Sequence, residues 1–374
     1  RELLEANRFR QDEIKKEMAE LGPWAVPGLV NSLYVYMHLF KDNSDAQLMI
    51  ADLISAQAQD NNAAAELIFR TGVVESPFAV SRNVALRALE TLEWKPNKEQ
   101  ISLVKSRIKE AQRLGDQIKE VDLNRLLAIS GDDQELPGLM EVYRRLMTDQ
   151  HEFGGMLAML VQKYPQKAKM IVIDVLQTAE QLYTKDKNIA DHIAKALGPI
   201  SADQRWLETD MMLEVSQEVL TKKNSGSKSH KSLEFVWNEV VKSSKFDNSL
   251  QKREFFNTFG QKVQQAGKNI RSEDARFTIY RYWFEAAGRS GGVDYICDEA
   301  FAPDDEWGFF AVVQLFFLEE RNSELGNTLQ KLKSSRPQRW NNANDLFIRI
   351  KSGKPMPSGR ELHVLSGGGG ISKH

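Results

Sequence analysis

Apolar residues recur at helical spacing along most of the chain, and short polar breaks separate the segments that carry them. Side chains at positions i, i+3, i+4 and i+7 share one face of an α-helix, so each such segment predicts an amphipathic helix. Clear examples are Ala85, Ala88, Leu89 and Leu92, and further on Leu136, Leu139, Met140, Tyr143 and Leu146. Only Val73–Val74 and Phe347–Ile350 resemble short strands, and both fit helix ends equally well. We therefore expect an all-α fold.

The breaks between these segments carry the residues that begin and end helices. Asn43, Ser44 and Asp45 predict a helix start, because a short polar side chain can accept from the free N–H groups of the first turn. The other breaks predict turns, since proline and glycine interrupt helices. These are Ser76–Pro77, Lys95–Asn97, Gly131–Asp133 and Gly198–Pro199.

A short Pro-Gly motif repeats along the first part of the chain. Val26–Leu29 and Leu136–Leu139 share the pattern Val/Leu-Pro-Gly-Leu, and Leu197–Ile200 repeats the Leu-Gly-Pro of Leu21–Pro23. Proline costs little near a helix start, because its missing N–H has no partner there. The segments between these motifs carry alanines that would let neighbouring helices approach closely. The pattern predicts helical hairpins that follow one another.

This arrangement resembles the HEAT and armadillo proteins, whose α-helical repeats have about 40 residues. The resemblance covers residues 12–220, and the basic residue usual in the second helix of a repeat is clear at Arg82 and Arg87. It implies an irregular array of stacked hairpins with an exposed surface for partners. The alternative is an irregular all-helical domain in which Pro-Gly only marks turns.

Composition changes after a hydrophilic stretch, and we use this change to divide the chain. Residues 222–232 predict a linker or mobile loop between a repeat-like domain at 1–221 and a mostly helical module at 233–350. Residues 351–374 are rich in glycine and proline and predict a flexible tail, unless a partner orders it. The module should pack around large rings. These are Phe235, Trp237, Phe255, Phe256, Phe259, Phe277, Tyr280, Tyr282, Trp283, Phe284, Trp307, Phe309, Phe310, Phe316 and Phe317.

Composition excludes several classes of protein. The 374 residues have a net charge of -2, six histidines and one cysteine, Cys297, so there is no internal disulfide and no cysteine-based zinc site. The neighbouring Asp298 and Glu299 should raise the pKa of the Cys297 thiol, so we expect a core residue and not a nucleophile. Because no run of about 18 apolar residues occurs, we expect a cytoplasmic protein without a membrane partner.

Charge is segregated in the C-terminal module. Residues 294–320 contain eight acids and no Lys or Arg, whereas residues 331–360 contain eight bases and one acid. Residues 222–271 are also basic, with eleven bases and four acids. One interpretation is that these segments face each other within the fold. The other is that the bases bind an anionic partner, with arginine forks on phosphates and the Trp340 ring on a base.

Catalytic motifs are almost absent. Gly288–Gly292 lacks the preceding strand and the lysine of a phosphate-binding loop, and His151–Gly155 lacks the second histidine of a zinc-protease helix. Glu320 and His363 could form an acid–base pair. With such a pair, the aromatic, charge-segregated C-terminal half resembles the bacterial defence proteins that carry an EH-signature module. No motif indicates a cofactor, a metal or a small-molecule ligand, and we expect none.

Three functional hypotheses follow from these patterns. The first is a non-enzymatic helical-repeat scaffold that binds a protein partner within a larger assembly. The second is a nucleic-acid-associated component of a bacterial DNA-handling or antiviral defence system, which binds the DNA backbone through its basic segments. The third is a hydrolase that uses Glu320 and His363. The predicted contact residues are Arg82, Arg87, Lys333, Arg336, Arg339, Trp340, Arg349 and Lys354.

Overall fold

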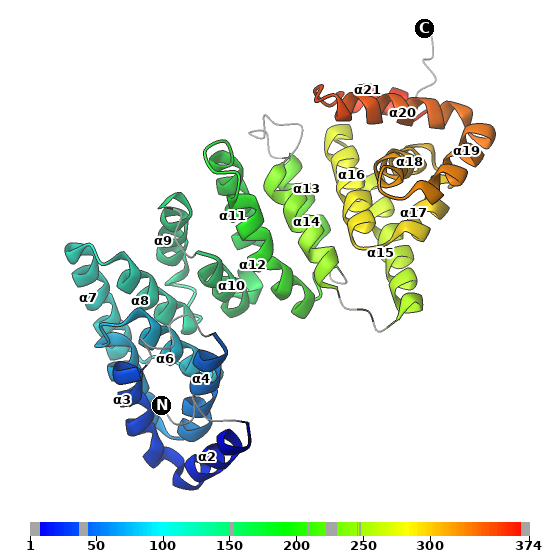
Figure 1. The fold of residues 1–374 in the computed structure, drawn as a ribbon. Helices are drawn as coiled ribbons and strands as arrows, with labels where there is room; N and C mark the ends of the chain where they lie inside the picture. Colours follow the sequence, from blue (N-terminus) through cyan, green and yellow to red (C-terminus); the bar gives the residue numbers. More distant parts are fainter. Residues whose placement is uncertain are drawn as a thin grey trace. The chain divides into compact units, whose positions relative to one another are not determined.

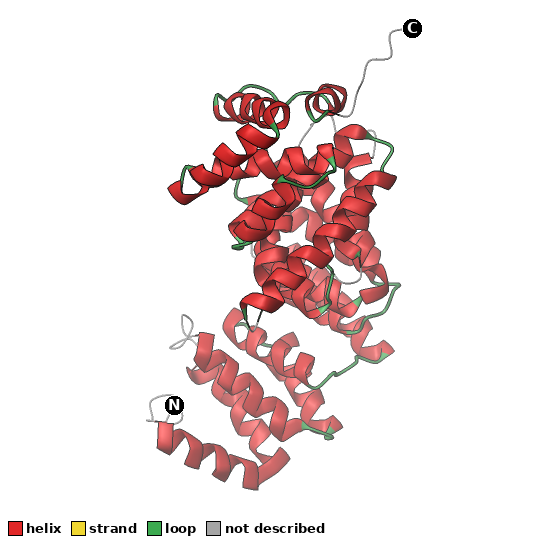
Figure 2. Ribbon diagram, turned by 90° about the vertical axis from the view of Figure 1, so that its right-hand side faces the viewer, coloured by secondary structure: helices red, strands yellow, loops and turns green. Residues whose placement is uncertain are grey.

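The computed structural model describes residues 8–36, 44–149, 153–207, 210–221, 230–244, 246 and 248–367. Within these ranges every regular element is a helix and no strand occurs (Figure 2), which confirms the all-α prediction. The chain divides into two compact units. Unit 1 comprises residues 1–146 and 163–165, and unit 2 comprises residues 147–162 and 166–374. No helix in the described ranges is both long and apolar enough to cross a membrane.

Unit 1 is built from short helices around a central one. In chain order they are α2 (Arg8–Leu21), η1 (Gly22–Ala25), α3 (Val26–Tyr36), α4 (Ser44–Ala58), α5 (Asn62–Leu67), η3 (Ile68–Val74), α6 (Ala79–Thr91), α7 (Lys98–Leu114), α8 (Gln117–Ile129) and most of α9 (Leu136–Asp149). Helix α6 is central, since it packs against α4, η3 and α8. Val73–Val74 therefore lies in a helical segment, and Asn43 lies outside the described residues.

The predicted local signals act as expected in unit 1. Asn97 begins α7 with a capping box, in which its side chain accepts from the Gln100 N–H and the Gln100 side chain accepts from the Asn97 N–H. Alanines bring α6 close to η3, because a Cβ on Gly72 would lie 2.7 Å from the Cβ of Ala85. The small residues of α6 thus allow the close approach that their spacing predicts.

Unit 2 contains the remaining helices of the described chain. They are α10 (Phe153–Lys163, mostly in this unit), η4 (Pro165–Lys167, partly in this unit), α11 (Ala168–Leu182), α12 (Ile189–Asp203), α13 (Met211–Thr221), α14 (Lys231–Ser243), α15 (Ser249–Asn269), α16 (Glu273–Arg289), α17 (Val293–Ala300), α18 (Asp305–Glu319), η5 (Ser323–Leu325), α19 (Gly326–Ser335), α20 (Pro337–Lys351) and α21 (Gly359–Leu365). Phe347–Ile350 thus belongs to α20.

Helices of unit 2 that are close in sequence pack side by side (Figure 1). Helix α14 contacts α11, α12 and α16, then α16 contacts α18, and α18 contacts α20. Such neighbour-to-neighbour packing is typical of helical arrays. Helical content and neighbour contacts do not distinguish a HEAT or armadillo array from other all-α folds, so the repeat stays a prediction.

The predicted turn at Gly198–Pro199 is wrong. Helix α12 continues through both residues to Asp203. A proline in a helix interior costs about 3 kcal/mol or more, so other contacts must offset it. Gly198 lies against α14, where a Cβ would be only 2.8 Å from the Ser243 Oγ, and the following Ile200 is buried. Packing between α12 and α14 therefore decides this segment.

The compact units do not divide at the predicted linker. Helices α12 and α14 pack against each other although they lie on either side of residues 222–229, which are outside the described residues. Residues 359–365, within the predicted tail, form α21. A capping box of Ser358 and Glu361 begins this helix, and the Gly359 N–H donates to the Asp274 carboxylate at the start of α16. These contacts order a segment whose composition predicts flexibility.

Aromatic rings form the core of unit 2, as predicted. The Trp283 ring lies at its centre, 5.1 Å from the Phe259 ring and 5.9 Å from the Phe256 ring between centroids. Its indole N–H donates to the Tyr295 hydroxyl at 3.0 Å, and the indole N–H of Trp237 donates to the Ser216 Oγ at 2.9 Å. The polar tips of these buried rings therefore have partners inside the core.

Candidate functional site

Several acids of residues 294–320 form ion pairs with bases from the two basic segments of the sequence. The nitrogen–oxygen distances are 3.0 Å for Arg253–Asp298, 3.1 Å for Lys268–Asp304 and 2.7 Å for Arg339–Asp305, and Lys351 also pairs with Glu320. The interpretation in which acidic and basic segments face each other therefore holds for these pairs. These ion pairs reduce the positive charge that remains available to a binding partner.

Arg339 is a buried structural residue and not a surface contact. Its guanidinium donates to the carbonyls of Ala300 at 2.9 Å and Ala302 at 2.8 Å, and to the Asp305 carboxylate at 2.7 Å. The two carbonyls lie at and just after the C-terminal end of α17, where a cation satisfies free carbonyls, and the Asp305 carboxylate lies at the start of α18. The guanidinium also fills the space beside Gly308, where a Cβ would lie 2.1 Å from Nη1. The structure does not favour the predicted phosphate contact of Arg339 for this reason.

Arg82 is likewise buried, in unit 1. Only 2% of its surface is exposed, its Nε lies 2.7 Å from the Asp122 Oδ2, and its Nη1 donates to the Ser76 carbonyl at 3.1 Å. It joins α6, α8 and the loop before α6, so it cannot contact a partner in this fold. Arg87, on the same helix, is exposed.

The Trp340 ring has two close neighbours. The Phe316 ring packs edge-on against it with centroids 5.4 Å apart, and the Lys333 Nζ lies 4.8 Å from its centroid. The indole N–H is buried without an acceptor among the described residues. Base stacking on Trp340 would require Lys333 to move away, so the structure does not favour the predicted stacking role.

Glu320 and His363 do not form the predicted pair. Glu320 bonds to Lys351, whereas the Nδ1 of His363 lies 2.6 Å from the Oε1 of Glu306. Arg276 also belongs to this cluster, since its Nη2 donates to the same Glu306 oxygen at 3.1 Å. The structure therefore does not support the acid–base pair on which the hydrolase hypothesis depends. Sequence reasoning missed Glu306 because it stands in the acidic first turn of α18, where acids are common for electrostatic reasons.

Other chemical candidates give no site. Cys297 is half-buried, and the pKa of its thiol is raised, mainly by burial and further by Asp294 and Asp298. Among the described residues no three His, Cys, Asp or Glu side chains gather as a metal site. His151 and Glu152 lie outside the described residues.

Six bases of α19–α21 and the intervening loop remain without an ion pair to any described carboxylate. We call them the unpaired C-terminal cations: Lys331, Lys333, Arg336, Arg349, Lys354 and Arg360. Arg336 and Arg349 donate only to backbone carbonyls, of Phe301 at 3.5 Å and of Pro355 at 2.8 Å. Lys331, Lys333, Lys354 and Arg360 are exposed. Four of the predicted contact residues belong to this set.

No known protein family matches this chain, and no match is found among curated proteins or among solved structures. The resemblances to HEAT and armadillo repeats and to EH-signature proteins therefore stay predictions.

Proposed function

We propose that the chain is a non-enzymatic α-helical scaffold whose unpaired C-terminal cations bind an anionic macromolecular partner. One observation supports this proposal above all. The neighbouring acids Asp298, Asp304, Asp305 and Glu320 pair with other bases, so the six cations have no carboxylate partner within the described part of the chain. An exposed group of like charges attracts an opposite surface within about 8 Å at physiological salt.

The leading partner is a protein that presents an acidic surface. The second candidate is a nucleic acid, which the arginines favour because a guanidinium fork matches a phosphate. Arg336 and Arg349 use part of their donors on backbone carbonyls and retain others. Phosphate contacts of this kind give affinity without sequence preference.

Binding of the full chain to polyglutamate and to a mixed-sequence DNA duplex, each at two salt concentrations, tests the proposal. The test variant carries Arg336→Gln, Arg349→Gln and Lys354→Gln. A matched control carries Lys98→Gln, Lys109→Gln and Arg113→Gln, which are exposed on α7 of unit 1. If DNA is the partner, the salt slope of the test variant should decrease by up to about three, since each phosphate contact contributes about 0.9.

The outcomes separate the two partners. If the test variant binds polyglutamate more weakly than the wild type and the control variant does not, the result supports the acidic protein partner. If the wild type binds DNA more tightly than polyglutamate, and the test variant binds DNA more weakly and with a reduced salt slope, the cations are assigned to phosphates. Equal affinities for the wild type and the test variant on both probes would show that these cations bind neither.

A further inference from the structure

A half-open groove with a volume of about 330 Å³ lies in unit 2 between α14, α16, α18 and α20. Its volume is within the range of about 300–1,000 Å³ that is typical of small-molecule sites. Apolar side chains from three helices and one loop contribute to the lining, beside charged ones. The apolar ones are Phe284 of α16, Phe310, Val313, Phe317 and Leu318 of α18, Leu346 and Ile350 of α20, and Met356 of the following loop. Such a surface suits an apolar ligand body.

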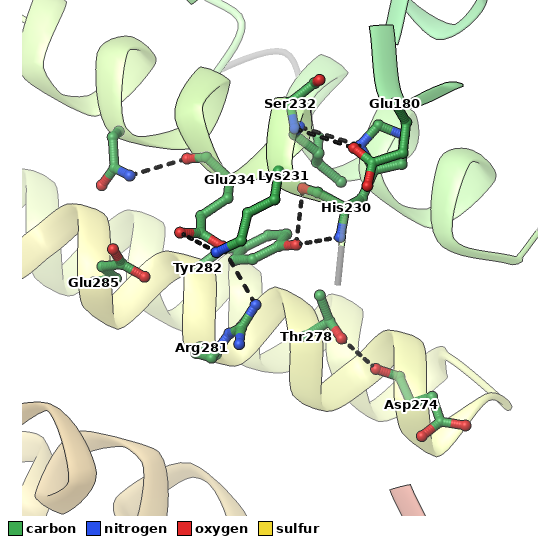
Figure 3. A network of polar contacts seen from close by, with 12 residues as sticks. Glu180, His230, Lys231, Ser232, Glu234, Asp274, Thr278, Arg281, Tyr282 and Glu285 are labelled. Carbon is green, nitrogen blue, oxygen red and sulfur yellow. Dashed lines mark hydrogen bonds and ion pairs between the residues drawn. The ribbon is translucent and has the colours of Figure 1, made fainter. Parts of the chain in front are cut away.

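One end of the groove carries excess positive charge. Lys231 and Arg281 both bond to the Glu234 carboxylate, at 3.0 Å from the Lys231 Nζ and 3.5 Å from the Arg281 Nη2 (Figure 3). Glu285 also attracts the Arg281 guanidinium, but its carboxylate bonds to Arg289 at 2.6 Å. Among these lining residues three cations therefore face two carboxylates. The buried Nε of Arg281 has no hydrogen-bond acceptor among the described residues, and a ligand cannot reach it. The side chain is nevertheless 20% exposed, and its Nη nitrogens have donors beyond the one used on Glu234. These donors can bond an anion.

A lone amide lies among the apolar residues of the groove. Gln314 is the one polar residue between Phe309 and Leu318, and it lines the groove without a hydrogen bond to any described group. Gly288 of α16 leaves the space for it, because a Cβ there would be 2.7 Å from the Gln314 Nε2. A polar group on an apolar helix costs stability unless something bonds to it. Gln314 is therefore suited to bond a ligand.

We propose that this groove binds a small amphipathic carboxylate, with its apolar body on the aromatic lining and its carboxylate bonded to Arg281 and Gln314. A guanidinium matches the geometry of a carboxylate, and an amide can add one further donor. The sequence predicts no small-molecule ligand, because the lining residues are spread between Lys231 and Met356 and meet only in the fold.

Titration calorimetry on the full chain with laurate, dodecanol and dodecylamine tests the chemistry of the ligand. We expect laurate to bind with one-to-one stoichiometry and about 10-fold or more tighter than dodecanol, because hydrogen bonds to charged groups are the stronger ones. Dodecylamine should bind more weakly still, since its charge opposes Arg281 and Lys231. Equal affinity for laurate and dodecanol, or no binding of laurate, would overturn the proposal.

Two matched variants of α20 test the location. Ile350→Trp fills the groove and should weaken laurate binding by about 10-fold or more. Ile348→Trp changes an exposed residue of the same helix outside the groove and should leave the affinity unchanged. Laurate binding that survives Ile350→Trp would place the ligand elsewhere and contradict the proposal.

A third variant separates the carboxylate contact from packing. Gln314→Leu keeps the apolar lining, so it should reduce the preference for laurate over dodecanol several-fold while dodecanol binding persists. The last measurement compares the affinity of an apolar peptide that has a free C-terminal carboxylate with that of the same peptide amidated at its C-terminus. If the peptide with a free terminus binds more tightly than laurate, the groove belongs to a protein C-terminus and the free-acid assignment fails.

Discussion

At the scale of single residues, burial decides whether a basic side chain supports the fold or is free for a partner. Arg82 and Arg87 lie on the same helix, and both fit the basic positions that the repeat resemblance implies. In the structure Arg82 is paired with Asp122 inside unit 1, whereas Arg87 is exposed. Their residue type is identical, so only their neighbours in space separate the two roles.

Removing Arg82 should destabilise the protein strongly. In an Arg82→Met variant the Asp122 carboxylate, of which 5% is exposed, loses its 2.7 Å ion pair. Breaking one partner of a buried pair typically costs about 3–5 kcal/mol, so we expect a loss of unfolding free energy of this order in urea denaturation. The control Arg87→Met should change it by less than about 0.5 kcal/mol.

A double variant distinguishes the ion pair from a general packing defect. Arg82→Met combined with Asp122→Leu removes both charges, so part of the lost stability should return. If the double variant is as unstable as the sum of the two single variants, the pair does not account for the effect.

At the scale of elements, the start of α14 depends on a neutral histidine (Figure 3). The Nδ1 of His230 accepts from the Leu233 N–H at 3.2 Å. The Tyr282 hydroxyl accepts from the backbone N–H of His230 at 2.8 Å and donates to its carbonyl at 2.9 Å. Burial lowers the pKa of His230 to about 4. Although the Glu180 Oε2 is 3.2 Å from the same Nδ1, the two groups do not form an ion pair at neutral pH.

This cap makes the stability of unit 2 depend on pH. Because the folded pKa of about 4 lies below the ordinary value of 6.5, the unfolded chain takes up the proton first as the pH falls. The stabilisation is therefore complete above pH 6.5 and is lost as the pH falls towards 4. Between about pH 7 and about pH 5 the loss should be on the order of 2 kcal/mol.

Denaturation of the wild type and of His230→Asn at the two pH values measures this contribution. Asparagine keeps a capping acceptor but does not titrate. Burial raises the pKa of Glu180, and this opposing term is common to both proteins, so their difference reports on His230. An identical pH dependence of the two proteins would contradict the assignment.

At the scale of the whole molecule, each unit has its own core. Leu86 is fully buried in unit 1 and Trp283 is fully buried in unit 2. We therefore expect Leu86→Ala and Trp283→Leu each to lower amide hydrogen-exchange protection chiefly in the unit that carries the substitution. Each should cost about 2–5 kcal/mol, as large-to-small core changes do. Equal loss of protection in both units by either variant would show that the two units unfold as one.

The sequence by itself determined the helices of this protein, because apolar periodicity and capping residues act over one or two turns. It also identified the aromatic core and most turns. The tertiary structure decided the continuation of α12 through Pro199, the ordering of α21 and the buried positions of Arg82 and Arg339. It also paired His363 with Glu306 and formed the groove around Gln314. Each of these depends on side chains distant in sequence, and local patterns carry no information about which distant residues meet.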